Sequence, residues 1–162
     1  MPSLLATIAR FFNADLTGRT WTRQILHPYF GEMTYFGSVK AEDCYWESEV
    51  DVPNQSERVG VTMSGTPDGP TAAEEQFCRS VIADSDLLLE QCRAAFEPEL
   101  KTWAKCPLPK PWQDAFKLDG FEIPRDADRS NPWTVCYFVE SAGHYFTAHF
   151  ESGMVSHVSV DG

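Results

Sequence analysis

Apolar and polar residues alternate along residues 44–52, which predicts a β-strand with two chemically different faces. One face is apolar and is expected in the core; its residues are Cys44, Trp46, Val50 and Val52. The other face is strongly anionic and is expected in solvent; its residues are Tyr45, Glu47, Glu49 and Asp51. The pattern is typical of a sheet that is covered on one side only.

Similar patterns predict seven further strands, at residues 19–26, 31–37, 57–64, 116–123, 133–140, 144–150 and 154–160. Between the two groups of strands, Thr71 and Glu74 form a capping box that starts a helix. That helix is expected to carry Ala73, Phe77 and Val81 on one stripe.

The sequence Asp84-Ser85-Asp86 is expected to end this helix and to cap a second one. Apolar residues recur at helical spacing along the second helix, at Leu89, Cys92, Phe96, Leu100 and Trp103. Pro98 lies inside that pattern and predicts a kink or a restart. A short amphipathic helix is also expected near the N-terminus at residues 4–12, and a stiff connector at residues 106–111.

The order of strands, helices and strands predicts an α+β fold in a single domain of residues 1–162. Its expected parts are an N-terminal helical segment (1–18), an antiparallel meander (19–64), two central helices (71–105) and a second antiparallel strand set (114–162). The two strand sets can form either one sheet or two separate sheets, and the sequence does not distinguish these arrangements.

The chain carries 24 acidic and 13 basic residues, a formal net charge of -11. This charge disfavours nucleic acid and anionic membranes as partners, and it favours a basic protein. The alternative is that the acidity only keeps the protein soluble. The 5 cysteines form no C-x-x-C pair, and no signal peptide or transmembrane run is evident, so free thiols and a cytoplasmic location are expected.

Known catalytic and nucleotide-binding motifs are missing from the sequence, so no catalytic residue, metal or cofactor is predicted. His149 and His157 are expected near each other across a hairpin, with Glu151 on the same face. They are the candidates for a metal or hydrolase site, and the alternative is an ordinary polar sheet face. Glu47 and Glu49 have the spacing of a carboxylate pair, but an open sheet face does not supply the cleft that a glycosidase needs.

Residues 42–57 contain six acidic residues and no basic one. The predicted partner-binding residues come from this segment and are Glu42, Asp43, Glu47, Glu49 and Asp51. An exposed field of this sign would speed association with a basic partner. The alternative is a salt-bridged surface, for which Arg58, Arg23 and Lys40 are available.

Four segments resemble a loose group of uncharacterised bacterial domains, over roughly residues 21–162. These segments are residues 27–33 (HPYFGEM), 45–47 (YWE), 133–135 (WTV) and 144–153 (HYFTAHFESG). Members of such families often look like immunity proteins of contact-dependent or polymorphic toxin systems. The resemblance implies no catalytic residues.

The leading hypothesis is therefore an acidic, cytoplasmic protein-binding module, specifically an immunity protein that neutralises a basic bacterial toxin. One alternative is a small hydrolase or metal-dependent enzyme with its site near the C-terminal strands. Another is a structural or homo-oligomeric module without catalytic activity.

Overall fold

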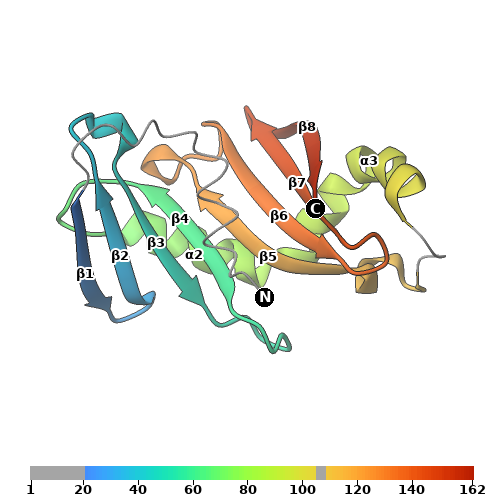
Figure 1. The fold of residues 1–162 in the computed structure, drawn as a ribbon, viewed down its shortest axis with the longest axis horizontal. Coiled ribbons are helices and arrows are strands. Elements are labelled where there is room, and N and C mark those ends of the chain that lie inside the picture. Colours follow the sequence, from blue (N-terminus) through green and yellow to red (C-terminus); the bar gives the residue numbers. More distant parts are fainter. Residues whose placement is uncertain (1–20, 105–108) are drawn as a thin grey trace.

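The computed structural model describes residues 21–104 and 109–162, which form one eight-stranded sheet with two long helices (Figure 1). The strands are β1 (Trp21–His27), β2 (Gly31–Gly37), β3 (Tyr45–Val50), β4 (Val59–Ser64), β5 (Phe116–Ile123), β6 (Trp133–Val139), β7 (His144–Glu151) and β8 (Met154–Asp161). The helices are α2 (Ala72–Ala83) and α3 (Ser85–Trp103), with three short 3₁₀ turns, η1 (Ala41–Asp43), η2 (Trp112–Ala115) and η3 (Arg125–Ala127). The predicted α+β class is confirmed.

The strands lie in the sheet in their chain order, from β1 to β8. Neighbouring strands are antiparallel except for β4 and β5, which are parallel and join the two halves into one sheet. A parallel pair needs a long crossover connection, and the segment with α2 and α3 supplies it. The question of one sheet or two is thus answered by the pairing of β4 with β5.

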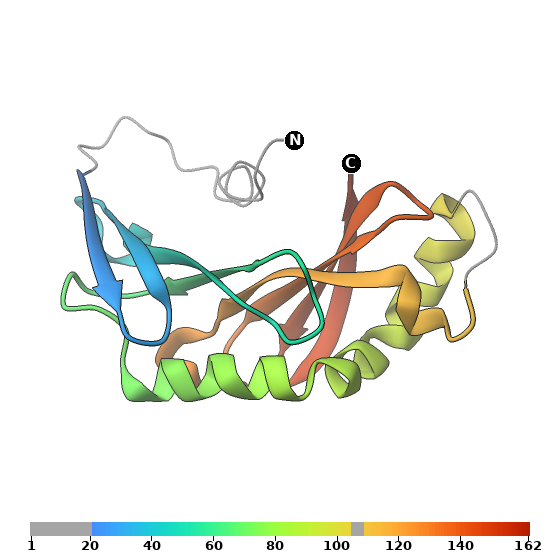
Figure 2. The same ribbon diagram turned by 90° about the horizontal axis from the view of Figure 1, so that it is seen from below.

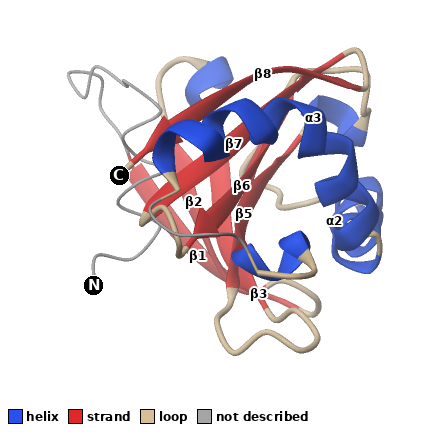
Figure 3. Ribbon diagram, turned by 90° about the vertical axis from the view of Figure 1, so that its right-hand side faces the viewer, coloured by secondary structure: helices blue, strands red, loops and turns tan. Residues whose placement is uncertain are grey.

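Both helices lie on the same side of the sheet, as Figure 2 shows in a view along its plane. Helix α2 contacts β5 and η3, whereas α3 contacts β7 and β8 (Figure 3). The covered face forms the core, and its largest fully buried side chains are Trp46, Tyr35, Tyr137, Phe30, Phe96 and Phe146. The predicted apolar face of residues 44–52 is part of this core, since Cys44, Trp46 and Val50 are buried.

Helix α2 begins with the predicted capping box. The Thr71 hydroxyl accepts a hydrogen bond from the Glu74 backbone N–H at 3.3 Å, and the Glu74 carboxylate accepts one from the Thr71 N–H. Thr71→Ala is expected to lower the free energy of unfolding by about 0.5–2 kcal/mol, because the Glu74 N–H loses its acceptor and the Glu74 carboxylate loses the hydroxyl donor. Thr71→Ser keeps the hydroxyl and serves as the control in urea unfolding. Equal losses in both variants would contradict a role for the cap.

Two details of the helices differ from prediction. Asp84 separates α2 from α3, as expected, but its side chain caps neither helix. Its backbone N–H donates to the Ser80 carbonyl, and its carbonyl accepts a hydrogen bond from the Leu88 N–H. Helix α3 continues through Pro98 to Trp103, so the restart expected there is wrong. The predicted N-terminal helix and most of the predicted connector lie outside the described residues.

Candidate functional site

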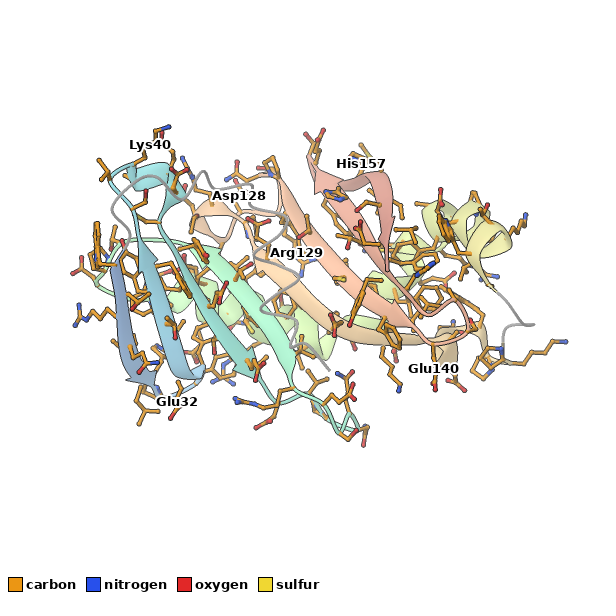
Figure 4. All side chains as sticks on the ribbon, viewed as in Figure 1. Glu32, Lys40, Asp128, Arg129, Glu140 and His157 are labelled. Carbon is orange, nitrogen blue, oxygen red and sulfur yellow. The ribbon has the colours of Figure 1, made fainter. Side chains whose placement is uncertain are left out.

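The side of the sheet opposite the helices is the candidate functional surface, which we call the open face. Side chains alternate between the two faces of a strand, so the open face receives the residues between the core residues of each strand. Figure 1 looks onto this face, and Figure 4 shows Glu32 and His157 toward its two ends. The open face thus runs across all eight strands of the described sheet.

Carboxylates dominate the open face. The described strands place seven of them there, namely Glu32, Glu47, Glu49, Asp119, Glu122, Glu151 and Asp161. On the same strands the open face carries one lysine, Lys117, whose ammonium lies 3.8 Å from Glu140. On the described strands, carboxyl groups therefore far outnumber lysines on this face.

A β-bulge in β5 adds one carboxylate to this face. The register with β6 shifts between Leu118 and Gly120, which leaves Asp119 as the extra residue. Leu118 and Phe121 both remain in the core, so Asp119 and Gly120 both face the open side. Strict alternation would have sent Leu118 and Phe121 to opposite faces, so sequence periodicity does not reveal this position.

Glu47 departs most clearly from the sequence prediction. It was expected in solvent, but it is 7% exposed, so the open face is covered at this point of β3. Burial raises the pKa of its carboxyl to about 7. In the described part of the chain, no hydrogen bond or ion pair compensates the carboxylate of Glu47.

Two more carboxyls of the open face have raised pKa values. Burial, followed by the nearby charge of Glu57, raises the pKa of Asp119 to about 6, and one buried oxygen of Asp119 has no hydrogen-bond partner. Burial also raises the pKa of Glu122. In the register of the sheet Thr62 pairs with both Glu47 and Glu122, so these two residues stand in one row, roughly 10 Å apart. Neither Asp119 nor Glu122 was predicted from the sequence as a site residue.

Glu47 lines a pocket of about 420 Å³ on strands β1 to β3. Among the other residues that line it, Gln24, Leu26, Glu32, Thr34 and Glu49 belong to the open face of their strands, and Arg58 directly precedes β4. The pocket therefore contains three carboxylates and one guanidinium. Within the described ranges Glu49 alone of the three has an ion-pair partner, and of the two unpaired carboxyls Glu47 is the buried one.

Of the other predicted partner-binding residues, only Glu49 lies in the pocket with Glu47. Arg58 lies 3.9 Å from Glu49 and 3.3 Å from Asp51, so these two carboxylates have the salt-bridged partner that the alternative prediction named. Glu42 and Asp43 belong to η1, at the opposite end of β3. Of the acidic segment, the structure thus places Glu47 and Glu49 together in the pocket.

His149 and His157 are brought together as predicted. They pair across β7 and β8, and their rings stack with centroids 4.0 Å apart. Burial and the neighbouring His157 lower the pKa of His149, whose Nε2 lies 3.1 Å from the Ser159 hydroxyl. Among the described residues, no group of three or more His, Cys, Asp or Glu side chains is arranged to hold a metal ion, so Glu151 does not complete a site here.

The described cysteines are free thiols, as predicted. Cys44, Cys78 and Cys92 are buried, and burial raises the pKa of Cys78, Cys92 and Cys136. A raised pKa keeps a thiol protonated and weakly nucleophilic at neutral pH. These three residues are therefore not activated nucleophiles.

Comparisons of the chain with protein-family models, with curated proteins and with solved structures find no match. Neither α2 nor α3, the two long helices in the described ranges, combines the length and apolarity that crossing a membrane requires.

The chemistry available to the open face follows from its buried carboxyls. A carboxyl with a pKa near 7 exchanges its proton at neutral pH, and a cation placed beside it favours the charged form. Glu47 lies in a pocket and has no counter-ion among the described residues, so a cation placed in the pocket would favour its charged form. The arrangement is suited to recognition of positive charge.

Proposed function

We propose that this protein is an acidic protein-binding module whose open face binds a basic partner. The observation that carries this proposal is the charge of that face, with seven carboxylates and one lysine on the described strands. Helices α2 and α3 occupy the other side of the sheet, so neither of these two described helices covers the open face. Complementary charge accelerates encounter and disfavours partners of the same sign.

The partner in the narrower form of the proposal is a basic bacterial toxin, which the protein neutralises by covering its active site. The resemblance to probable immunity proteins supports this form, and so does the acidic character of the open face. A toxin-like reading frame immediately upstream of the gene would add to it. Protection of growth when the two proteins are produced together is the direct measurement.

The general proposal is tested by affinity capture from the native host on the immobilised full chain. A basic protein is expected to bind at about 0.05 M salt and to be released at about 0.5 M, because salt screens interactions between exposed charges. A variant of the open face removes three exposed or half-exposed carboxylates by the changes Glu32→Gln, Glu49→Gln and Glu151→Gln. Its affinity for the captured protein is expected to fall roughly ten-fold, at about 0.5 kcal/mol per charge.

The matched control removes three carboxylates from the helices instead, by the changes Glu75→Gln, Glu90→Gln and Glu97→Gln. It changes the net charge by the same amount, and it is expected to bind like the wild type. Equal weakening in both triple variants would show that net charge alone drives capture. That result, or the absence of any salt-sensitive basic partner, would contradict the proposal.

A further inference from the structure

We infer that the pocket on strands β1 to β3 receives an arginine side chain of the basic partner, with Glu47 as its carboxylate ligand. The inference rests on the proposed function and adds to it a specific recognition point. It concerns a site of side-chain size, whereas the proposal above concerns the charge of the whole face.

Glu47 is a buried carboxyl without a partner among the described residues. Its exposed fraction is 7%, and it lines the pocket without a hydrogen bond or ion pair in the described part of the chain. Ionised carboxylates are rarely buried unless they are paired, because the lost hydration is not otherwise replaced. A cation entering the pocket would supply that missing partner.

Around the pocket, carboxylates outnumber cationic side chains. Glu32, Glu47 and Glu49 line it together with a single cation, Arg58. The Arg58 guanidinium already contacts Glu49 and Asp51, and it donates a hydrogen bond to the Glu49 backbone carbonyl. Arg58 therefore already pairs with Glu49 and Asp51, and Glu47 is left to bind a cationic ligand.

The geometry of the guanidinium group favours arginine over other cationic side chains as the ligand. A guanidinium presents a planar fork of donors that fits one carboxylate with two parallel hydrogen bonds. Thr34 and Gln24 line the same pocket and offer further acceptor oxygens, and Leu26 offers apolar surface for the methylene stem. The pocket volume of about 420 Å³ accommodates such a side chain.

The proton of Glu47 gives the site a pH dependence. The charged and titratable groups around Glu47 in the described residues are Glu32 on β2, Tyr45 and Glu49 on β3, Arg58 before β4, and Glu122 on β5. Strands β1 and β4 face it with Gln24, Leu26 and Thr62, which do not titrate. With a pKa of about 7, Glu47 is mostly neutral at pH 6 and mostly charged at pH 8.

The test titrates the full chain with N-acetyl-arginine methylamide and follows backbone amide resonances by NMR. We expect shifts at Thr34 and Glu47, with a dissociation constant on the order of millimolar, because one side chain makes few contacts. Affinity should rise roughly ten-fold from pH 6 to pH 8, as Glu47 ionises. N-acetyl-citrulline methylamide has nearly the same shape without the charge, and it should produce no such shifts.

Glu47→Gln should abolish both the shifts and the pH dependence, whereas Glu90→Gln on the helix side should leave them unchanged. Equal shifts with the arginine and citrulline probes, no binding of the arginine probe, or unchanged binding in Glu47→Gln would each overturn the inference. Folding of Glu47→Gln is checked by its unfolding curve and amide spectrum. The citrulline comparison uses the wild type, so it decides the matter even if the variant does not fold.

The outcomes also separate this inference from the proposed function. Salt-sensitive capture of a basic protein without binding of the arginine probe would refute the pocket and leave the proposed function in place. Binding of the arginine probe without any captured basic protein would support the pocket and contradict the proposed function.

Discussion

Trp46→Ala is expected to lower the free energy of unfolding by about 3–5 kcal/mol, the range for removing a large aromatic side chain from a core. Trp46 has no exposed surface, and its ring lies 4.9 Å from that of Tyr35, between centroids. Its indole N–H donates a hydrogen bond to the Thr66 carbonyl at 2.9 Å. The substitution therefore removes packing and also leaves the Thr66 oxygen without this donor.

Equilibrium urea unfolding, followed by circular dichroism, measures this loss. Trp46→Phe separates its two components, since it keeps most of the ring but not the donor, and it should cost about 1–2 kcal/mol. Leu26→Ala is the exposed control, because Leu26 is 80% exposed, and it should cost no more than about 0.5 kcal/mol. A loss at Trp46 as small as that at Leu26 would mean that β3 presents its other face to the core.

Glu47→Gln is expected to change how stability depends on pH. The folded protein holds the Glu47 proton up to a pKa of about 7, whereas the ordinary value is 4.5. Between these two values the folded state binds more protons than the unfolded state, so the contribution of Glu47 to stability decreases as pH rises. Above pH 7 the full destabilisation remains, and below pH 4.5 it disappears.

Glutamine removes this titration, so the variant should gain stability relative to the wild type as pH rises from 4.5 to 7. The gain should then level off at roughly 2 kcal/mol, because each tenfold change in proton affinity corresponds to about 1.4 kcal/mol and pocket water reduces the total. Urea unfolding at several pH values measures the difference between the two proteins. The contributions of Asp119 and Glu122 are common to both and cancel.

Glu49→Gln provides the comparison within the same pocket. Glu49 is partly exposed and pairs with Arg58, so its loss should change stability by less than about 1 kcal/mol. Parallel curves for Glu47→Gln and the wild type over this pH range would show that Glu47 is hydrated in the folded protein. The pocket would then have no need of a cation.

Much of the fold follows from local patterns in the sequence. The strand predicted at residues 116–123 matches the bounds of β5, and Ser152-Gly153, with positive φ angles of 51° and 77°, forms the hairpin turn between the strands predicted at 144–150 and 154–160. Turns of this kind bring neighbouring strands together without long-range information. His149 and His157 are therefore predictable as a pair, because they lie on either side of such a turn.

The acidic site was predictable only in part. Alternation assigns Glu47 and Glu49 to one face of β3 but does not reveal that one is buried and the other paired. Glu122 lies between the core residues Phe121 and Ile123, so its face was readable from the sequence. Its position beside Thr62 depends on the parallel pairing of β4 with β5, which no local pattern encodes.

The parallel pair β4–β5 differs from the other strand pairs in sequence separation. The antiparallel neighbours are joined by short connections, whereas β4 and β5 meet only after residues 65–115 have closed a long loop. Such closure loses chain entropy before its contacts form, so it depends on the docking of α2 and α3. A substitution that weakens the docking of either helix is therefore expected to weaken the junction where Thr62 meets Glu122, although both residues lie on the opposite side of the sheet. The helices thereby influence the middle of a face that they do not touch.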